Sequence, residues 1–299
     1  MTELIKLAEK LNIKYSENEP MKNHTTFKVG GNAKLMVYPK SAQDTARIVK
    51  LCKEQGIRLL AIGNGSNLLV SDNGIDACVM CFGNDFSDIK LIDEETVFAE
   101  SGASLMKLCR FALENGLSGL EFAYGIPGSC GGAAFMNAGA YGGEMKDVLY
   151  RCDHIDENGN IGYSEGEDMR LSYRHSAYYE NGCIITGLYL KLKKADKSEI
   201  KAKMDDLLQR RKDKQPLEYP SAGSTFKRPE GYFAGALIEE CGLKGKTVGG
   251  AQVSEKHAGF VINKGGATCR DILDLCDECA KTVMREKGVK LEMEIRVTE

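Results

Sequence analysis

A glycine-rich, uncharged stretch near the middle of the chain constrains the fold and the function more than any other feature. No charged residue occurs between Phe122 and Gly143, and seven of the nineteen residues from Gly125 onward are glycine. Glycine loses more conformational entropy on folding than any other residue, so this density requires positive φ angles or a close approach of the backbone to a bound group. A turn buried between strands is the alternative, and it suits a single glycine pair better than this density.

The same stretch lacks the cation of a phosphate-transferring loop. Backbone N–H groups in a glycine-rich loop can point together at one anion. A nucleotide-hydrolase loop would carry a lysine directly after its last glycine, and residues 125–143 contain no lysine. We therefore expect this loop to hold a phosphate group without transferring it.

A second glycine-containing loop, Gly63-Asn-Gly-Ser-Asn-Leu-Leu-Val70, follows a strand-like run. Its opening is similar to the dinucleotide-binding fingerprint, but position 68 is leucine and a further strand-like run stands where a helix should begin. This argues against a Rossmann site. Two phosphate-binding loops, one in each of two lobes, instead predict a dinucleotide cofactor whose pyrophosphate lies between the lobes, with Asn64, Ser66 and Asn67 adding hydrogen bonds.

The composition is that of an ordinary globular protein. The 299 residues are 42% hydrophobic and 28% charged, with a formal net charge of −3. This balance gives no reason to expect nucleic-acid or anionic-membrane binding, and we interpret the dense basic run over 210–214 as a solvated helix face. The amino terminus mixes charged and apolar residues, and no apolar run reaches membrane length, so we expect a cytoplasmic protein that does not bind membranes.

The cysteines and histidines predict neither a disulfide framework nor a metal site. Eleven cysteines are an odd number, and we expect reduced thiols. Cys276 and Cys279 share a helical apolar stripe with Ile272, Leu275 and Val283, so we interpret them as core residues rather than as a redox or zinc pair. The four histidines show no metal-ligand spacing.

The pattern of apolar residues and turn signals divides the chain into three predicted parts, a first lobe over 1–85, a second lobe over 86–197, and a third part over 198–299 that begins with a linker helix. In the first lobe, Ser41 and Asp44 predict a capping box for a helix that ends near Gly56. The strands predicted for this lobe are 35–38, 58–62 and 77–82.

The second and third parts carry the longer predicted elements. In the second lobe we predict a strand over 96–100, a helix over 104–115 and a strand over 182–192. The third part is predicted to contain an amphipathic helix over 198–214, a capped helix from Thr268 with Asp271 to Gly288, and a strand over 290–297.

Seven motifs, in order along almost the whole chain, resemble the UDP-N-acetylenolpyruvoylglucosamine reductase family. They are Asn23-His-Thr-Thr-Phe-Lys-Val-Gly-Gly31, Gly63-Asn-Gly-Ser-Asn-Leu-Leu-Val70, Gly125-Ile-Pro-Gly-Ser-Cys-Gly-Gly132, Asn137-Ala-Gly-Ala-Tyr-Gly-Gly143, Ser172-Tyr-Arg-His-Ser176, Ser221-Ala-Gly-Ser-Thr-Phe-Lys227 and Leu291-Glu-Met-Glu-Ile-Arg296. Any one motif is weak, whereas seven in sequence make coincidence a poor explanation. The third part leaves no room for an extra substrate-capping segment, so the chain resembles the shorter form of the family. Cys130 stands where a small apolar residue such as valine is expected, which affects no chemistry.

The resemblance implies an α+β fold, with a two-lobed FAD-binding unit of the vanillyl-alcohol-oxidase type and a smaller α+β substrate-binding domain. It implies that FAD is held noncovalently and that NADPH reduces the flavin. UDP-N-acetylglucosamine enolpyruvate would then be reduced to UDP-N-acetylmuramate, a step of peptidoglycan precursor synthesis that serves cell-wall biogenesis, cell shape and cell division. The nucleotide-sugar substrate is the expected partner, with no obligate protein partner and no nucleic acid.

The resemblance assigns the cofactor contacts to the two glycine loops and to two positions outside them. These residues are Tyr38, Gly63, Asn64, Gly65, Ser66, Asn67, Leu68, Gly125, Ile126, Pro127, Gly128, Ser129, Gly131, Gly132, Ala133, Asn137, Ala138, Gly139 and Arg174. The substrate-binding residues that it implies are Tyr173, Lys227 and Arg228, the latter two for the diphosphate.

The resemblance also implies three catalytic residues, and their chemistry suits the reaction. Hydride addition leaves negative charge that spreads into the substrate carboxylate, where each well-placed donor contributes roughly 3–4 kcal/mol. Arg174 would grip that carboxylate with two parallel hydrogen bonds. Glu294 would act as a protonated, hydrogen-bonding acid, which requires a raised pKa. Ser224 would deliver the proton from the face opposite the flavin.

Each catalytic assignment has a structural alternative. Arg174 could be a surface arginine stacked on a neighbouring tyrosine, Tyr173 or Tyr178, and Ser224 could be an ordinary turn residue. Glu294 could lie on the solvent face of an alternating strand. Glu292 shares that strand face, and alternation does not choose between the two carboxylates.

His24 and His257 could either maintain the fold of their motifs or contact a ligand. Both lie within a few residues of glycines in the sequence. Nothing in their spacing decides between these two roles.

Three other functions are alternatives to the reductase. An FAD-dependent oxidase or dehydrogenase acting on an alcohol or hydroxy acid would leave Ser224 and Glu294 without a clear task. A non-catalytic nucleotide-sugar-binding protein is the alternative from another class, because glycine loops indicate binding and not turnover. A hydrolase that uses Ser224 is disfavoured, since the sequence around it is not a nucleophile elbow.

Overall fold

The computed structural model describes residues 1–299, which form two compact units assembled from separated stretches of the chain. Unit 1 comprises Met1–Glu17, Leu35–Asn64 and Ala77–Arg210. Unit 2 comprises Asn18–Lys34, Gly65–Asp76 and Arg211–Glu299. Two stretches of the predicted first lobe therefore belong to the same unit as the carboxy-terminal residues. The finer division at residues 85 and 197 stays a prediction.

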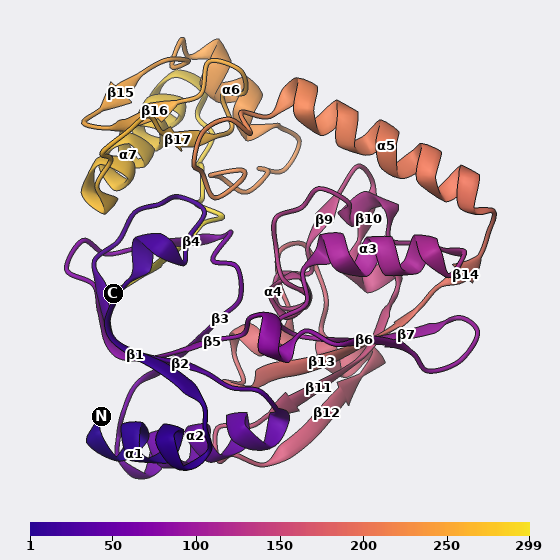
Figure 1. Cartoon of the computed structure of the whole chain (residues 1–299). Helices are drawn as coiled ribbons and strands as arrows, with labels where there is room; N and C mark the ends of the chain where they lie inside the picture. The colour runs from indigo at the N-terminus through magenta and orange to yellow at the C-terminus, as the bar shows by residue number, and fades with distance from the viewer. The chain divides into compact units, whose positions relative to one another are not determined.

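A four-stranded sheet with the order β1-β2-β5-β3 begins the fold. Its strands are β1 (Lys14–Pro20), β2 (Asn32–Tyr38), β3 (Leu59–Ile62) and β5 (Ile75–Cys81). Helices α1 (Thr2–Lys10) and α2 (Ala42–Glu54) pack on it through an apolar cluster that includes Leu4, Leu35, Ile48, Cys78 and Met80. Figure 1 shows these two helices side by side near the amino terminus.

Helix α2 begins and ends where its sequence signals predict. The Ser41 hydroxyl accepts a hydrogen bond from the Asp44 N–H at 3.1 Å, and Gly56 adopts a φ of 61° just beyond the last turn. The reciprocal half of the predicted capping box does not form on Ser41, because Asp44 instead accepts a hydrogen bond from the Lys40 N–H at 3.4 Å.

The second sheet is five-stranded and antiparallel, with the order β12-β11-β13-β7-β6. Its strands are β6 (Ile89–Leu91), β7 (Thr96–Glu100), β11 (Leu149–Ile155), β12 (Ile161–Glu165) and β13 (Ile184–Lys191). Helices α3 (Leu105–Glu114) and α4 (Cys130–Phe135) share one large core with it, formed by residues such as Val97, Leu105, Leu108, Cys130 and Leu188. In Figure 1 both helices lie on one side of this sheet.

Unit 2 is built around the long helix α7 (Cys269–Lys287), which packs on a three-stranded antiparallel sheet. The strands of this sheet are β15 (Thr247–Val248), β16 (Ala251–Val253) and β17 (Val261–Asn263). Helix α6 (Ala234–Glu240) contacts α7. Strand β4 (Leu68–Val70) pairs in parallel with β18 (Arg296–Thr298), so the end of the second glycine loop is hydrogen-bonded to the carboxy terminus.

The remaining elements are short connections apart from helix α5. This helix (Lys197–Lys214) leads from the last residues of unit 1 into unit 2 and buries Ile200, Met204 and Leu207. The two-residue strands are β8 (Leu117–Ser118), β9 (Gly139–Ala140), β10 (Gly143–Glu144) and β14 (Lys193–Lys194). The 3-10 helices are η1 (Met21–Asn23), η2 (Asn84–Phe86), η3 (Glu121–Ala123), η4 (Met145–Asp147), η5 (Gly166–Met169) and η6 (Ala177–Tyr179).

Helix α7 confirms its predicted caps and has a further one that its own sequence does not reveal. Thr268 and Asp271 form a complete capping box, and Gly288 ends the helix with a φ of 69°. The carboxylate of Asp72 accepts hydrogen bonds from the N–H groups of Cys269 at 2.7 Å and Arg270 at 3.1 Å. A negative charge at a helix amino terminus is stabilising, so Asp72 fastens the stretch that follows the second glycine loop to α7.

None of the eleven cysteines is part of a disulfide, and nine of them are buried. Cys276 and Cys279 belong to the core of unit 2, as predicted. Burial raises the pKa of both thiols, which keeps them protonated and unreactive.

Two predictions about the last third of the chain are wrong in part. Residues 290–295 form no continuous strand and make a single bridge between Phe226 and Met293, because the partner segment runs into Pro229, which has no N–H to extend the pairing. The basic run over 210–214 is not wholly solvated. The side chain of Arg211 is buried and donates a hydrogen bond to Gln215 at 3.2 Å, whereas its four neighbours in the run are exposed.

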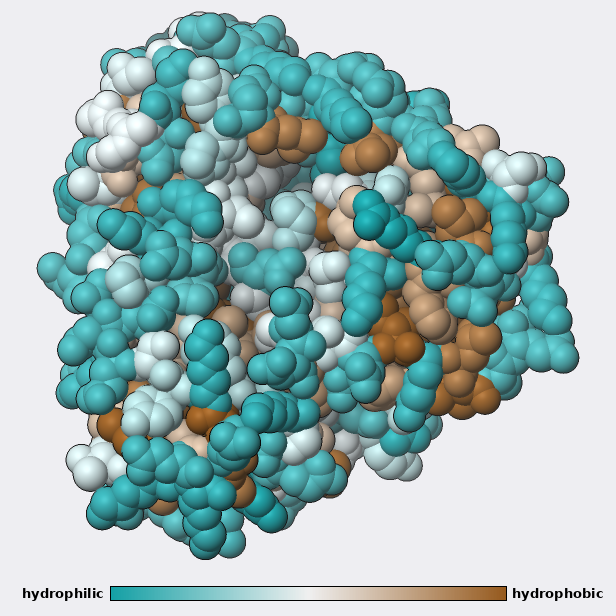
Figure 2. Space-filling view, viewed as in Figure 1, coloured by the Kyte–Doolittle hydropathy of each residue, from teal (hydrophilic) through white to brown (hydrophobic).

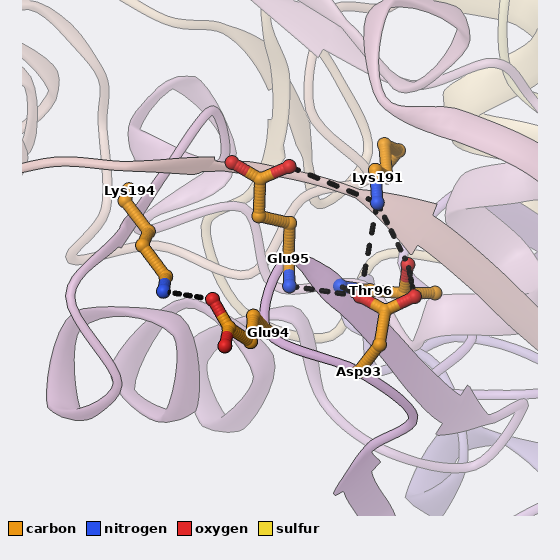
Figure 3. Close-up of polar contacts among 6 residues, drawn as sticks. All are labelled: Asp93, Glu94, Glu95, Thr96, Lys191 and Lys194. Atoms are coloured by element: carbon orange, nitrogen blue, oxygen red, sulfur yellow. Dashed lines mark hydrogen bonds and ion pairs between the residues drawn. The ribbon is translucent and has the colours of Figure 1, made fainter.

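An acidic turn, Asp93-Glu-Glu95, connects β6 and β7. Asp93 accepts hydrogen bonds from the N–H groups of Glu95 and Thr96 at 2.9 and 2.7 Å, and Lys191 lies 3.7 Å from Asp93 and from Glu95 (Figure 3). Hydrogen bonds from the turn backbone hold the pKa of Asp93 below its usual value. The cluster therefore stabilises a turn, and no group of three or more His, Cys, Asp or Glu side chains in the chain is arranged to hold a metal ion.

Hydrophilic side chains cover most of the face shown in Figure 2, and apolar side chains gather there in separate small patches. None of the helices is both long enough and apolar enough to cross a membrane.

Glu121, which precedes the glycine-rich stretch, is a buried carboxylate with a structural role. Its side chain is 3% exposed and accepts hydrogen bonds from Ser118 at 2.6 Å and from the Gly119 N–H at 3.1 Å, with Lys203 of α5 at 3.4 Å. Burial opposes its ionisation, but these donors together hold the pKa of Glu121 below its usual value. The carboxylate thus fixes the entry to the glycine-rich stretch against α5.

Replacing Glu121 by glutamine is expected to lower the free energy of unfolding at neutral pH by about 1–3 kcal/mol. The reason is that Ser118, the Gly119 N–H and Lys203 would then face a neutral amide instead of a negative charge. A depressed folded-state pKa contributes stability that is present above the unfolded pKa and lost as the pH falls through the folded pKa. The difference between E121Q and the unmodified chain should therefore shrink in urea unfolding curves recorded at progressively lower pH. Glu114→Gln, at an exposed carboxylate, is the control. A constant difference at every pH would contradict this account.

Candidate functional site

The two glycine loops that the sequence singles out contact each other in unit 1. A Cβ atom at Gly63 would lie 1.9 Å from the Ser129 hydroxyl oxygen, so only glycine fits there. The Asn64 side chain donates a hydrogen bond to the Pro127 carbonyl at 3.0 Å. The first residues of one loop are therefore packed against the turn of the other.

The middle of the glycine-rich stretch is a short helix rather than the continuous loop that we expected. Ser129 caps α4, and its hydroxyl accepts a hydrogen bond from the Gly132 N–H at 3.3 Å. The N–H groups of Cys130 and Gly131 donate to the Ala103 and Ser101 carbonyls, and they are therefore used within the fold. The reason for the difference is local: a serine cap and small residues allow one helical turn.

Two backbone donors at this turn remain outside the internal hydrogen-bond network. The N–H groups of Gly128 and Ser129 donate to no group of the chain. They lie directly beside Gly63 and Asn64, across the contact just described. Adjacent N–H groups of this kind suit an anion such as a pyrophosphate, and this is the property that a dinucleotide cofactor requires.

Asn137 joins the end of the glycine-rich stretch to the motif that contains Arg174. Its side chain is fully buried, and its amide donates to Glu144 at 2.7 Å and to the Ser172 carbonyl at 2.9 Å, while its oxygen accepts from the Lys146 N–H at 2.9 Å. The side chain of this predicted cofactor contact is thus occupied within the protein. It connects the end of the glycine-rich stretch to the motif that contains Arg174.

Arg174 lies at the tip of a tight turn beside the glycine-rich stretch. Ser172 and His175 exchange two backbone hydrogen bonds of 3.1 Å, which leaves Tyr173 and Arg174 as the turn residues. Arg174 has a φ of 54°, a left-handed conformation that is costly for a side chain of this size and that is common at functional sites. Its guanidinium donates to the Gly139 carbonyl at 3.4 Å.

The stacking alternative for Arg174 is also observed. The guanidinium carbon lies 5.1 Å from the centre of the Tyr173 ring, whereas Tyr178 is buried and its hydroxyl lies 3.2 Å from His154. Tyr173 is exposed. Stacking on an exposed neighbour orients the guanidinium without removing it from solvent, so this contact is compatible with a ligand-binding role.

Ser224 is presented by a rigid segment of unit 2. Gly223 has a φ of 76°, and Thr225 is fixed on both sides, because its N–H donates to the Gly259 carbonyl at 2.9 Å and its hydroxyl accepts from the Val261 N–H at 2.8 Å. Ser224 itself is exposed, and its hydroxyl makes no hydrogen bond within the chain. The arrangement holds the backbone and leaves the hydroxyl available.

The structure distinguishes the two carboxylates that sequence alternation left open. The Glu294 N–H donates to the Thr225 carbonyl at 2.8 Å, and the Glu294 carbonyl accepts from the Asn67 side chain at 3.1 Å. The side chain of Glu292 is 57% exposed and lies 3.9 Å from Lys227 and 3.6 Å from Lys290. Glu294 is thus the partly buried carboxylate beside the Ser224 segment, and Glu292 is the solvent-facing one.

Arg228, Tyr38 and His24 each contact other side chains or the backbone of the chain. Arg228 donates to the Tyr232 carbonyl at 3.3 Å, and its guanidinium carbon lies 4.0 Å from the centre of the exposed Phe233 ring. Lys14 lies 4.8 Å above the Tyr38 ring. His24 pairs with Glu19 at 2.8 Å.

Two family models match long stretches of the chain. The model described as an FAD binding domain matches residues 33–162, and the model of the UDP-N-acetylenolpyruvoylglucosamine reductase carboxy-terminal domain matches residues 215–298. The UDP-N-acetylenolpyruvoylglucosamine reductase of Clostridium novyi is 50% identical over 277 residues, which cover 93% of this chain and 90% of that protein. The chain belongs to this reductase family. It is therefore an oxidoreductase of peptidoglycan synthesis with an FAD-binding domain, and the predicted α+β fold is confirmed.

Other members of the reductase family support this placement. The enzyme of Syntrophomonas wolfei is 48% identical over 280 residues, with 94% of this chain and 93% of that protein covered. The crystal structure of the reductase from Thermus caldophilus superposes with a TM-score of 0.81 at 35% identity, and it covers 96% of this chain and 99% of that one. An alkyldihydroxyacetonephosphate synthase structure, at 15% identity and a TM-score of 0.51, covers 65% of this chain and 40% of that one and shares the fold alone.

The contact between the two glycine loops makes a direct prediction. Gly63→Ala is expected to separate the loops, since the new Cβ would meet the Ser129 hydroxyl, and to lower the free energy of unfolding by about 1–3 kcal/mol. We also expect it to reduce FAD retained after gel filtration. Gly83→Ala is the matched control, because a Cβ there meets no atom within 4 Å. Equal FAD retention in the two variants would show that the loop contact does not serve cofactor binding.

Proposed function

We propose that this chain binds FAD noncovalently and uses NADPH to reduce UDP-N-acetylglucosamine enolpyruvate to UDP-N-acetylmuramate. The observation that carries the proposal is the contact of the two glycine loops at Gly63 and Ser129, within the residues that match an FAD binding domain. Asn137 ties the Arg174 turn to the same loops. Eleven cysteines without a disulfide suit a reducing compartment, and we propose the cytoplasm.

The residues at the loop contact fit FAD. The free N–H groups of Gly128 and Ser129 would hold the pyrophosphate. Gly63 and Gly65 have no side chain, which lets the backbone pack closely on Ser129 and on the His24 carbonyl. Asn64 and Ser66 would add hydrogen bonds. Bound FAD would supply two-electron chemistry, taking a hydride from NADPH and delivering it to the outer carbon of the enol ether.

Arg174 would bind the substrate carboxylate through its planar guanidinium. The charge that develops on hydride addition spreads into that carboxylate, so the cation stabilises the transition state more than the ground state. The left-handed backbone and the hydrogen bond to Gly139 would fix the side chain before substrate arrives. Its stacking partner, Tyr173, would contact the substrate as well.

Ser224 would give its proton to the carbon that bears the carboxylate. Hydride on one carbon and a proton on the other reduce the double bond, so electrons and atoms balance. An exposed hydroxyl that is not engaged within the chain can recover its proton from water. The clamped backbone of Thr225 would hold Ser224 in place through this step.

Glu294 would donate a hydrogen bond to the substrate carboxylate as a neutral acid. Its backbone is held by Thr225 on one side and by Asn67 on the other, and its side chain is more shielded from solvent than that of Glu292. Shielding favours the neutral form of a carboxyl group.

Lys227 and Arg228 follow Ser224 in the chain and would bind the substrate diphosphate. Arg228 is pre-oriented by its contacts with Tyr232 and Phe233, which lowers the entropy lost on binding. Glu292, 3.9 Å from Lys227, would limit its mobility in the free protein.

Isotope incorporation tests the proposed reaction. In D₂O with ordinary NADPH, the carbon of the product that bears the carboxylate should carry deuterium, read by mass spectrometry. A protein that holds FAD and does not consume the enol ether would indicate the oxidase or dehydrogenase alternative. A protein that binds the nucleotide sugar and retains no FAD would indicate the binding-protein alternative.

A further inference from the structure

A chain of hydrogen bonds in unit 2 connects His257 to both proposed proton-handling residues. The Gly259 N–H donates to Nδ1 of His257 at 3.0 Å, and the Gly259 carbonyl accepts from the Thr225 N–H at 2.9 Å. The Thr225 carbonyl in turn accepts from the Glu294 N–H at 2.8 Å. Thr225 directly follows Ser224, so one end of this chain is an imidazole and the other end positions Ser224 and Glu294.

The surroundings of His257 fix its ring and its tautomer. The ring packs edge-on against Phe260 with centroids 5.1 Å apart, and a Cβ on Gly235 or Gly259 would lie 3.1 or 2.9 Å from it. Both glycines are thus required by the close contact with the ring. Because Nδ1 accepts a hydrogen bond, it carries no proton, and the neutral ring has its proton on Nε2.

Protonation of His257 would break this arrangement. A proton on Nδ1 would face the Gly259 N–H, so that two donors would meet and one buried N–H would lose its acceptor. The charged groups around the ring are Lys244 and Glu239, which pair with each other at 2.6 Å, and Lys214 at the end of α5. Burial lowers the pKa of His257, and the two lysines act in the same direction, against a backbone hydrogen bond and Glu239, which raise it.

We propose that His257 is a positioning residue that, in its neutral form, holds the Ser224 and Glu294 segments in place through Gly259 and Thr225. This inference rests on the proposed function, since only the proposed reaction assigns a catalytic role to Ser224 and Glu294. Loss of the Nδ1 acceptor would loosen the clamp at Gly259 and Thr225 without removing any group that touches substrate.

The sign of the pH dependence follows from the direction of the shift. A base whose folded pKa is depressed contributes stability that is present above its unfolded pKa of about 6.5 and lost as the pH falls through the folded pKa. In the unmodified protein, the rate of flavin reoxidation by the enol ether should therefore fall at acid pH. This fall should disappear when His257 is replaced by a residue that does not titrate.

Two substitutions separate the acceptor from the packing. His257→Asn retains an acceptor where Nδ1 lies and does not titrate, while His257→Phe retains the ring and loses the acceptor. With FAD bound, H257F should slow flavin reoxidation by the enol ether roughly tenfold or more, as expected for loss of one buried hydrogen bond. H257N should keep most of the rate, and both variants should be bleached by NADPH at the normal rate.

Amide hydrogen exchange provides a readout independent of turnover. The peptide that contains Gly223 and Thr225 should exchange faster in H257F than in H257N, and in the unmodified chain it should exchange faster, beyond the intrinsic pH effect, as the pH falls. Equal exchange and equal reoxidation in H257F and the unmodified chain would overturn the inference. If the unmodified holoenzyme is bleached by NADPH and never reoxidised by the enol ether, the proposed function fails, and the exchange result still decides whether His257 holds the segment.

Discussion

Replacing Ser224 by alanine should leave flavin reduction by NADPH near its normal rate and slow flavin reoxidation by the enol ether roughly 10²–10⁴-fold. The reason is that only the second half-reaction requires a proton at the carbon that bears the carboxylate. The hydroxyl of Ser224 makes no hydrogen bond within the chain, so its removal leaves no internal donor or acceptor unpaired. Stopped-flow absorbance of the flavin measures both half-reactions on one sample.

Ser221→Ala is the matched control for this prediction. Ser221 lies in the same segment and forms a backbone bridge to Ile262, so its substitution tests whether any loss of a hydroxyl near Ser224 has the same effect. Equal slowing of the two half-reactions in S224A would remove Ser224 from the role of proton donor and would indicate a general disturbance of the segment.

Replacing Arg174 by methionine is expected to slow the same reoxidation step roughly 10²–10³-fold, because a preorganised charge that faces the developing carboxylate charge is lost. Arg174→Lys should recover only part of this, since an ammonium group cannot make the two parallel hydrogen bonds of a guanidinium. The affinity for the product, measured by titration of the oxidised flavin, should also fall.

Arg170 offers a close control for Arg174. It lies four residues earlier, also has a positive φ, of 44°, and pairs with Glu180 at 2.8 Å. Arg170→Met therefore removes an arginine of similar backbone strain outside the proposed site. If R170M and R174M slowed reoxidation equally, the effect would belong to the fold of this region and not to a contact with substrate.

Local signals in the sequence predicted local structure well. Ser41, Ser104 and Thr268 each cap the helix that they were expected to begin, because a cap depends on residues within one turn. The sequence predicted that the two glycine loops serve one dinucleotide, which stays a prediction; the contact between them and the lack of clearance at Gly63 come from the structure.

Long-range pairing was beyond the reach of sequence patterns. The segment over 290–295 has the alternation of a strand, but its partner segment ends at Pro229, and only one bridge forms. The choice between Glu292 and Glu294 depends on the backbone of Thr225 and the side chain of Asn67, which are distant in the chain. The cap that Asp72 provides for α7 has no sequence signal for the same reason.

Two of the observed contacts have a signal in the sequence. Glu121 is an acidic residue directly before a long uncharged run, and a carboxylate in such a place is expected to be buried and hydrogen-bonded. Gly259 follows His257 by two residues in the sequence, and in the structure this glycine packs closely on the imidazole ring. The left-handed backbone of Arg174 has no signal in the sequence, because it follows from the turn that Ser172 and His175 close.

The most direct test of the proposed function is an anaerobic absorbance experiment on the unmodified protein. The purified chain, supplied with FAD where needed, should show an oxidised flavin band that NADPH bleaches and that UDP-N-acetylglucosamine enolpyruvate then restores rapidly. Bleaching without restoration would mean that the electrons pass to another acceptor, and the absence of any bound flavin would contradict the account of the two glycine loops.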